Sequence, residues 1–384
     1  MRVLHFFKTA LPESRGGIEQ VINQLCRGAS QHGIQSDVLA LSQGADKSSF
    51  DYDGYRNHRA KLDFHLASTG FSLSAFARFA DLARQADLIH YHFPWPFMDL
   101  VHFATRVNKP SLVTYHSDVV RQKNLLRVYR PLMNAFLGST NSIVASSPNY
   151  LETSDVLQKF EDKVSVITYG LDKSTYPVPA ASELAAWADK LGPKFFLFVG
   201  VLRYYKGLHI LIDAAQGLDY PIVIAGAGPI EADLKQQVRD LGLKNIHFLG
   251  HLSEADKAAL LTLCYAVVFP SHLRSEAFGI SLLEGAMFGK PMISSEIGTG
   301  TTFINIANET GLVVPPSNPV ALHNAMQQLW DQPDEAAKMG RRAEARYWSH
   351  FTADKMVAAY VALYEKLVAN IIQPEVADTY RPSA

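Results

Sequence analysis

Two acidic residues bracket a Phe-Gly pair in the stretch SEAFGISLLEGAMFGKP, which begins at Ser275. Glu276 precedes the pair, and Glu284 follows eight residues after Glu276. The run AVVFPS just before this stretch is typical of a buried strand, and ISLLEGAMFG is typical of a helix closed by a glycine. We therefore expect Glu276 in a loop and Glu284 on a helix that begins near Gly279.

The start of this helix could hold an anion. The first N–H groups of a helix lack partners within it, and the helix dipole is positive at that end. The backbone amides of Phe278, Gly279, Ile280 and Ser281 are therefore placed to bind phosphate oxygens. Glu284, roughly 6 to 8 Å further along, has two acceptor oxygens that suit a ribose diol. The same spacing also suits acids that cap a helix start or lie in solvent.

Two cations stand where they could reach the same diphosphate. Arg203 and Lys206 lie in GVLRYYKG, directly after the strand pattern FFLFVG and before a helical run. Their charges would neutralise a departing diphosphate. Each residue taken alone is equally compatible with an ordinary surface cation.

The first half offers weaker signals at the ends of its expected strands. Gly16 and Gly17 occupy the first turn between a strand and a helix, where backbone amides could approach an anion or a sugar. His116 ends the strand SLVTYH and offers an imidazole at the rim of a cleft, although a structural role is equally compatible with it. The stretch HYHFPWPF lacks a third ligand at metal spacing, so we interpret it as a wall on the acceptor side.

These residues need a scaffold, and the pattern of the chain predicts one. Short β-branched or aromatic runs alternate with helical runs in both halves, which is typical of an α/β protein with mostly parallel sheets. A stretch rich in Pro, Ala and turn residues marks a boundary near 171–193. In such sheets, ligands gather at the carboxyl ends of the strands. The run VIAGAGP lacks the third glycine of a dinucleotide fingerprint, so we interpret it as a strand-end turn.

Composition narrows the class of protein. The 384 residues include 36 basic and 37 acidic side chains, with a formal charge of -1, which favours no nucleic-acid partner. Cys26 and Cys264 are too few for a disulfide framework, and a reducing cytosol fits best. The chain shows neither a signal-peptide pattern at its start nor a run of some 18 apolar residues, so we expect a cytoplasmic protein.

One segment suggests contact with a membrane surface. RQKNLLRVYRPLMNAF, near residues 121–136, sets Arg121, Lys123, Arg127 and Arg130 among apolar residues, as in a basic amphipathic helix. The pattern fits two interpretations: a helix in peripheral contact with the inner face of the cytoplasmic membrane, or a helix whose charged face lies in solvent. A further helical segment from Thr352 is expected to pack back on the first half.

Taken together, GGIEQV, HSD, GVLRYYKG, EAFGISLLE and NETGLVVPP resemble the retaining glycosyltransferases of family 4 along nearly the whole chain. The stretch SSEIGTGTTFINIANETGLVVPP further resembles bacterial O-antigen mannosyltransferases, whose donors are typically GDP-sugars. The resemblance implies the GT-B fold, in which two Rossmann-like domains face a central cleft. It also implies an acceptor domain at about 1–180, a donor domain at about 190–350, and a C-terminal helix at about 352–375.

The resemblance assigns a role to each candidate residue. Arg203 and Lys206 would bind the donor diphosphate together with amides at 279–281, and Glu284 would hold the ribose. Glu276 would contact the transferred sugar, with His116 near its 6-position, while the Leu252 backbone would meet the base. Gly16 and Gly17 would shape the acceptor side. No metal or other cofactor is implied, and the sequence shows no DxD-type metal motif.

The function expected from this resemblance is transfer of a sugar, mannose from GDP-mannose, to a lipid-linked glycan. Two alternatives stay open. A nucleotide-sugar 2-epimerase on the same fold would convert the donor without an acceptor. A non-catalytic subunit of a polysaccharide assembly complex would bind the nucleotide without turnover, although the acid at Glu276 argues against that reading.

Overall fold

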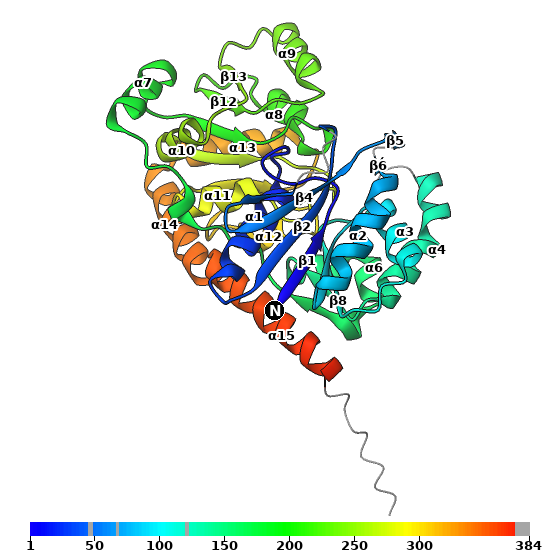
Figure 1. Cartoon of the computed structure of the whole chain (residues 1–384). Coiled ribbons are helices and arrows are strands. Elements are labelled where there is room, and N and C mark those ends of the chain that lie inside the picture. The colour runs from blue at the N-terminus through cyan, green and yellow to red at the C-terminus, as the bar shows by residue number, and fades with distance from the viewer. Residues whose placement is uncertain (45–48, 67–68, 120–122, 373–384) are drawn as a thin grey trace, which may run out of the picture.

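The computed structural model describes residues 1–44, 49–66, 69–119 and 123–372. Two largely parallel sheets, each flanked by helices, make up the molecule (Figure 1). The α/β class with two parallel-sheet domains, expected from the sequence, is confirmed.

The first sheet has eight strands, and its neighbours are parallel except for one antiparallel pair at its edge. Its strands are β1 (Arg2–Phe6), β2 (Gln35–Ser42), β3 (Ser49–Tyr52), β4 (Tyr55–Lys61), β7 (Leu88–Phe93), β8 (Ser111–Tyr115), β9 (Ser142–Ala145) and β10 (Val164–Val166). Their order across the sheet is β10-β9-β8-β7-β1-β2-β4-β3. The central position of β1, β7 and β8 places the residues that follow them at the middle of the cleft-facing edge.

Helices cover both faces of this sheet, and a small hairpin lies beside it. The helices are α1 (Gly17–Ser30), α2 (Leu73–Gln85), α3 (Pro96–Thr105), α4 (Lys123–Ser139), α5 (Pro148–Thr153) and α6 (Asp155–Gln158), with a 3-10 turn, η1 (Glu161–Lys163). The hairpin pairs β5 (Phe64–Leu66) with β6 (Thr69–Phe71) in antiparallel fashion.

The second sheet has six strands, and all its pairings are parallel. Its strands are β11 (Phe196–Val199), β12 (Ile222–Ala225), β13 (Ile246–Gly250), β14 (Ala266–Phe269), β15 (Met292–Ser295) and β16 (Gly311–Val314), in the order β13-β12-β11-β14-β15-β16. Its helices are α7 (Ala181–Leu191), α8 (Leu208–Ala214), α9 (Glu231–Asp240), α10 (Glu254–Leu263), α11 (Ile280–Met287), α12 (Thr301–Ile304), α13 (Pro319–Asp331) and α14 (Pro333–His350). Two 3-10 turns, η2 (Lys173–Thr175) and η3 (Tyr204–Lys206), complete this half.

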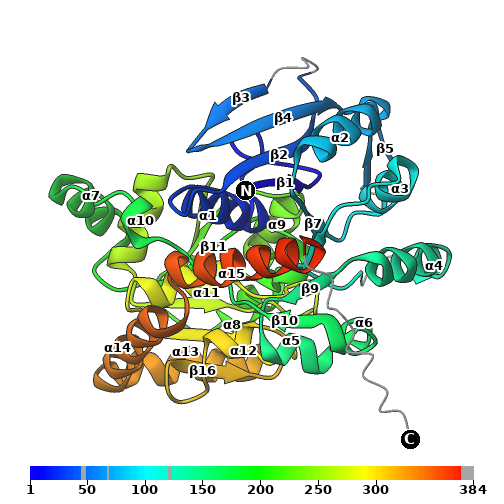
Figure 2. The same ribbon diagram turned by 60° about the horizontal axis from the view of Figure 1, so that its bottom comes forward.

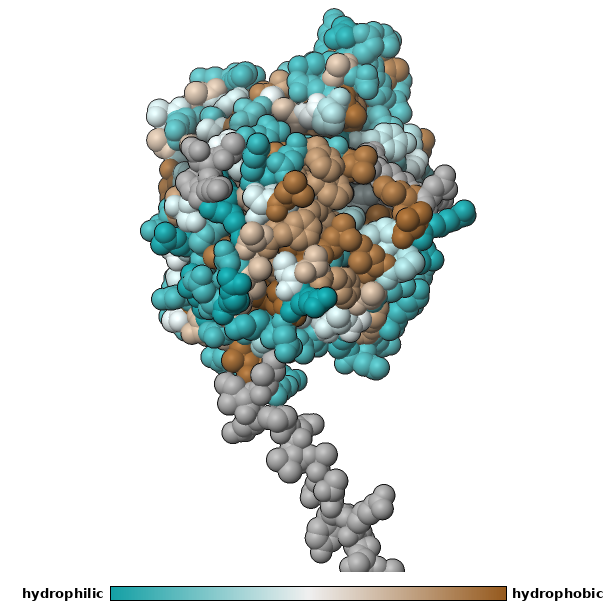
Figure 3. All heavy atoms as spheres, turned by 45° about the vertical axis from the view of Figure 1, so that its right-hand side comes forward, coloured by the Kyte–Doolittle hydropathy of each residue, from teal (hydrophilic) through white to brown (hydrophobic). Residues whose placement is uncertain are grey.

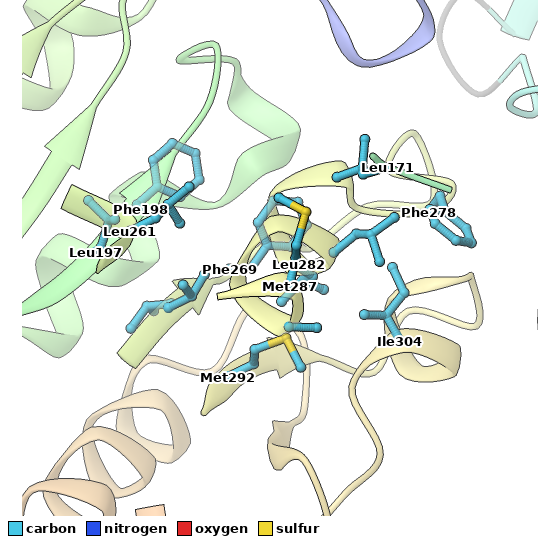
Figure 4. Packing of buried hydrophobic residues seen from close by; sticks show 14 of the residues in the cluster. Leu171, Leu197, Phe198, Leu261, Phe269, Phe278, Leu282, Met287, Met292 and Ile304 are labelled. Atoms are coloured by element: carbon cyan, nitrogen blue, oxygen red, sulfur yellow. The ribbon is translucent and has the colours of Figure 1, made fainter. Parts of the chain in front are cut away.

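Helix α11 is fixed by its apolar face. Leu282 and Met287 of this helix are fully buried and pack near Phe269 of β14 and Met292 of β15 (Figure 4). Burying a side chain of this kind contributes about 1.5 to 3 kcal/mol, so the helix start is held firmly at the end of β14. This start carries the candidate phosphate site.

The chain crosses between the two halves twice, and the crossings lie side by side. Leu171 of the first crossing pairs with Thr352 of the second in a short parallel bridge. The backbone N–H of Leu171 donates to the Phe351 carbonyl at 3.0 Å, and that of Ala353 donates to the Leu171 carbonyl at 3.0 Å. From there α15 (Ala353–Ile372) runs back beside α1 (Figure 2).

Helix α7 falls inside the boundary expected at 171–193. It contacts α10 of the second half, where the Trp187 indole N–H donates to Asp256 at 3.0 Å. The stretch therefore contains a helix of the second half as well as a linker. Within the described residues, no helix is long and apolar enough to span a bilayer.

Candidate active site

The loop after β14 and the start of α11 form the centre of the site. Gly279 is the N-cap residue of α11 and has φ +100°, a backbone conformation that favours glycine. Because glycine has no side chain with which to cap the helix, the amides of the first turn are left to a ligand or water. The Ser281 hydroxyl donates to the Val199 carbonyl at 2.7 Å, which ties α11 to the end of β11.

Lys206 and Glu276 form a nearly buried ion pair in front of this helix start. Lys206 ends η3, which follows β11, and its Nζ binds Glu276 Oε2. Burial by itself lowers the pKa of Lys206, but the charge of Glu276 and the nearby Tyr205 outweigh it, so the pKa is raised. The side chain therefore stays a cation. Arg203 begins the same 3-10 turn and is exposed.

Glu284 is buried and already holds two partners. Lys257 Nζ lies 2.9 Å from its Oε1, and the Tyr176 hydroxyl donates to the same oxygen at 2.8 Å. Burial alone lowers the pKa of Lys257, but Glu284 and Glu254 raise it further than burial lowers it. The Gln20 side-chain amide from the first half donates to the Tyr176 hydroxyl at 2.9 Å. Glu284 therefore lies where both halves meet.

His116 turns its imidazole inward rather than toward the cleft. Its Nδ1 lies 2.6 Å from the Tyr169 hydroxyl, and its Nε2 lies 2.9 Å from Nδ1 of His92. Burial, with a smaller contribution from Lys8, lowers the pKa of His116 to about 3, so the ring is neutral. The sequence left open an imidazole at the cleft rim and a structural role for His116, and the protein partners of both ring nitrogens favour the structural role.

The first strand-to-helix turn of the first half faces α11 directly. Gly16 is the N-cap of α1, and a Cβ there would lie 2.5 Å from Oε2 of Glu19. A Cβ at Gly17 would lie 3.1 Å from Cγ1 of Ile280, across the cleft. The turn therefore packs against the start of α11 through Gly17, where a side chain would press on Ile280; at Gly16 the nearby Glu19 carboxylate could move aside.

Leu252 lies apart from this centre, between β13 and α10. Its side chain packs against the core of the second half, and Lys257, the partner of Glu284, follows on α10. The structure thus brings together Arg203, Lys206, Glu276, Phe278, Gly279, Ile280, Ser281 and Glu284 around the ends of β11 and β14, with Gly16 and Gly17 opposite.

Four further residues of the site are not predicted from the sequence. Tyr169 and Tyr176, both in the crossing segment, bind His116 and Glu284, and Lys257 pairs with Glu284. Lys8 follows β1, and its charge helps to lower the pKa of His116; the pKa of Lys8 is itself lowered, mainly by burial and further by Arg203. The position of Lys8 directly after a central strand is a signal that could have identified it.

The stretch HYHFPWPF is not a wall of the cleft. His90, His92 and Trp95 are all at most 1% exposed, because β7 is a central strand covered on both faces. The expected acceptor-side wall is therefore wrong. His90 and His92 lie within the interior beside His5.

A cavity of about 260 Å³ opens beside the site on the side of the first half. Tyr115 and Asp118 line it next to His116, and Leu126 and Arg130 of α4 form another wall. Arg274, two residues before Glu276, reaches it from the second half and pairs with Asp118 at 3.2 Å. The cavity is therefore within reach of the Glu276 loop.

Comparisons with known proteins agree along the whole chain. Residues 182–346 match the family described as glycosyl transferases group 1, and residues 15–175 match glycosyltransferase family 4. A D-rhamnosyltransferase of Pseudomonas aeruginosa is 64% identical over 353 residues, 92% of this chain and 93% of that protein. O-antigen chain mannosyltransferase C of Escherichia coli is 48% identical over 371 residues, 96% of this chain and all of that protein.

A solved structure shows the same fold at low identity. Sucrose-phosphate synthase from Thermosynechococcus elongatus superposes with a TM-score of 0.81 at 22% identity, covering 96% of this chain and 99% of that one. This similarity shows the two-domain arrangement alone.

Proposed function

The chain belongs to glycosyltransferase family 4 and has the GT-B fold, and from this membership we propose that it transfers a manno-configured hexose from a GDP-sugar during O-antigen synthesis. The observation that carries the proposal is the Lys206–Glu276 pair in front of the Gly279 helix start. In this proposal, the Lys206 ammonium group binds the diphosphate of the donor, and the Glu276 carboxylate contacts the transferred sugar.

The donor diphosphate binds at the start of α11. Amides at Gly279, Ile280 and Ser281 donate to its oxygens, while Lys206 and Arg203 supply positive charge from the turn after β11. Glu284 accepts from the ribose hydroxyls through the oxygen that Tyr176 and Lys257 leave open. The backbone at Leu252 meets the base.

Transfer proceeds with retention and without a metal ion. The acceptor hydroxyl attacks the anomeric carbon from the same face on which the diphosphate leaves. The bond between the anomeric carbon and the phosphate oxygen breaks, and the hydroxyl proton passes to a phosphate oxygen of the leaving group. Lys206 and Arg203 neutralise the charge that develops on the leaving group, which is the role that a metal ion plays elsewhere. Glu276 binds a hydroxyl of the transferred sugar and remains paired with Lys206.

Two donors are consistent with the relatives. The 64% relative is named for D-rhamnose and the 48% relative for mannose, and these sugars differ only in the hydroxyl at carbon 6. With both ring nitrogens bound internally, His116 can contact carbon 6 through its main-chain carbonyl or its ring edge. The carbonyl would suit the hydroxyl of mannose and the ring edge the methyl group of D-rhamnose, so the higher identity to the D-rhamnosyltransferase makes GDP-D-rhamnose the first donor to test and GDP-mannose the second.

The acceptor is a lipid-linked glycan, and the first half meets the membrane. Figure 3 shows hydrophobic side chains gathered on one side of this half, on β5, α2, α3 and α4. Arg127 and Arg130 of α4 are exposed beside Leu125 and Val128, a combination that suits an anionic lipid surface. Arg121 lies outside the described residues, and so does the side chain of Lys123.

The test compares Glu276→Gln with the surface control Glu344→Gln. Glutamine keeps the shape of the acid but removes the charge, so transfer from GDP-D-rhamnose or GDP-mannose should fall by about 100-fold or more. The affinity for GDP should stay close to that of the wild type, whereas the thermal midpoint should fall because Lys206 loses its buried counter-charge. Full transfer activity of Glu276→Gln would refute the assignment.

Two further incubations separate the remaining functions. Donor alone, followed by NMR of the sugar, should show no conversion at carbon 2; conversion would indicate an epimerase. A thermal-shift panel of nucleotides should show GDP stabilising the protein far more than UDP, because only a bound ligand shifts the midpoint. GDP binding without any transfer to a lipid-linked acceptor would indicate a non-catalytic subunit.

A further inference from the structure

A row of hydrogen-bonded imidazoles runs beneath the site through three neighbouring strands. Nδ1 of His5 on β1 lies 3.1 Å from Nε2 of His92 on β7. Nδ1 of His92 lies 2.9 Å from Nε2 of His116, directly after β8. The row continues from His116 to the Tyr169 hydroxyl at 2.6 Å. All three histidines are buried, with exposures of 0%, 1% and 3%.

The row reaches the donor helix through one more contact. The ring of Tyr169 packs on that of Phe278 with centroids 4.8 Å apart. Phe278 directly precedes Gly279, whose amide begins the candidate phosphate site. A continuous series of contacts therefore joins the floor of the first sheet to the start of α11 in the other half.

The tautomers of the row are coupled to one another. A neutral imidazole has one donor and one acceptor nitrogen, so each ring fixes the tautomer of the next. The protons point either all toward Tyr169 or all toward His5. In the described chain, His5 Nε2 is buried without a hydrogen-bond partner, so the row ends there and leads no proton to solvent. Its geometry suits holding rings in place rather than relaying protons.

The contacts of these histidines argue against a metal site. Ligand atoms of His5, His90 and His92 lie within 4.8 Å of one another. Both nitrogens of His90 already have partners, the Tyr364 hydroxyl at 2.7 Å and the Thr114 hydroxyl at 2.6 Å. Both nitrogens of His92 are engaged in the row. A metal ion would have to break several of these bonds.

We propose that His92 is a positioning residue for sugar transfer: by binding His116, it holds His116 and Tyr169, and through Tyr169 the Phe278–Gly279 helix start, in the geometry that the reaction needs. This inference rests on the proposed transferase function. His92 itself lies below the cleft, so it acts only through the residues that it holds.

His90 provides a matched control within the same strand. It is 0% exposed, stacks on His92 at 4.3 Å, and uses both nitrogens in hydrogen bonds. Its partners lead to Tyr364 and, through Thr114, to Tyr360 on α15. His92→Phe removes the partner of His5 Nδ1 and of His116 Nε2, whereas His90→Phe removes one partner each from the Tyr364 and Thr114 hydroxyls, and Thr114 keeps its bond to Tyr360. Only His92→Phe breaks the row to His116.

The experiment measures transfer kinetics, GDP affinity and the thermal midpoint of His92→Phe and His90→Phe. We expect both variants to lose stability to a similar extent. His92→Phe should also lower kcat by about 10- to 100-fold, the scale of a misplaced catalytic geometry, while His90→Phe keeps kcat within about twofold. GDP affinity should change by less than about threefold in either variant.

Tyr169→Phe serves as a milder second variant if His92→Phe does not fold. It keeps the ring on Phe278 and removes only the hydroxyl that binds His116, so we expect a fall in kcat of about tenfold with little change in the midpoint. Equal kcat losses for His92→Phe and His90→Phe, or full activity of Tyr169→Phe, would overturn the positioning role. A wild-type protein that transfers no sugar would instead overturn the proposed function.

Discussion

Each of the two acids of the site uses one of its carboxylate oxygens for contacts within the protein. Within the described residues, the hydrogen bonds and ion pairs of Glu284 all use Oε1, and those of the Glu276 side chain use Oε2. Each carboxylate therefore keeps its charge balanced by a lysine and has one oxygen to offer a ligand. Buried carboxylates without such partners would be costly, so the lysines allow both acids to remain in the site.

Glu284→Gln tests the ribose contact. The neutral amide should weaken GDP binding by about 10- to 100-fold, because hydrogen bonds to a charged acceptor contribute about 1.5 to 3 kcal/mol. Inorganic pyrophosphate has no ribose and should bind the variant about as well as the wild type. Calorimetric titration with both ligands gives the two affinities. Equal weakening of GDP and pyrophosphate would place Glu284 at the phosphates or in a purely structural role.

The sequence predicts the site residues that follow strands, but not their partners. Lys206 and Glu276 stand where a parallel sheet gathers its ligands, so their proximity could be expected from the order of elements. Tyr176 lies 108 residues from Glu284, and their contact depends on how the chain crosses between the halves. The inward orientation of the His116 imidazole could not be predicted from the sequence either, because it depends on a contact with His92 from another strand.

At the scale of elements, apolar and β-branched strands were predictable, including the edge strands β10 and β13, whereas the mostly polar strands were not. The interior strands β8, β11, β12 and β14 are largely apolar or β-branched runs, and β7 adds two buried histidines to such a run. The sequence reading identified no strands at β3 to β6. YRNHRAK of β4 is mostly polar because that strand lies near the sheet edge, where one face and several side chains meet solvent. Helix α7 was obscured by the prolines that precede it.

The turn that carries Lys206 depends on a glycine. Gly207 has φ +71°, and a Cβ there would lie 2.0 Å from the carbonyl oxygen of Pro270, which follows β14. Gly207→Ala should therefore push apart the two loops that hold Lys206 and Glu276. We expect pyrophosphate and GDP to bind at least about tenfold more weakly, because a misplaced charged contact loses most of its free energy.

Gly217→Ala is the matched control for this change. Gly217 has a similar φ of +79°, but a Cβ there would meet no atom within 4 Å. Both variants carry the cost of a left-handed alanine, about 1 to 2 kcal/mol in urea unfolding. Only Gly207→Ala should lose ligand affinity as well. If the two variants bound pyrophosphate equally well, the contact between the loops would not matter for the site.

At the scale of the whole molecule, the second half is held to the first by its own chain end. Helix α15 leaves the second half and packs beside α1, and its Tyr360 and Tyr364 bind Thr114 and His90 in the interior of the first sheet. A Cβ at Gly28 of α1 would lie 2.4 Å from a methyl group of Val357, which shows how closely the helices approach. The buried histidines therefore join three strands and the C-terminal helix into one interior.

This interior makes the whole fold sensitive to acid. Burial is the main cause that lowers the pKa of His5 and His116 to about 3, and it lowers the pKa of His90 and His92 as well. In the unfolded chain each of them titrates near 6.5, so below that pH the unfolded state binds more protons and the free energy of unfolding falls. The contribution of the neutral, buried histidines to the free energy of unfolding is fully present above about pH 7. It is lost as the pH decreases toward 3.

Urea unfolding at pH 8, 7, 6 and 5 measures this dependence. Each buried histidine contributes up to about 1.4 kcal/mol per pH unit below its unfolded pKa, so several acting together should give a steep fall between pH 6 and 5. The pKa of Asp37 is lowered to about 2, because His58 and Arg2 outweigh its burial. Asp37 therefore changes the free energy of unfolding only at lower pH, outside the range from pH 8 to 5. His5→Phe removes one titrating ring and should reduce the slope by about one proton. A free energy of unfolding that stays flat from pH 7 to 5 would mean that these rings take up protons as readily in the folded protein as in the unfolded chain, and the neutral, tautomer-coupled row would then be wrong.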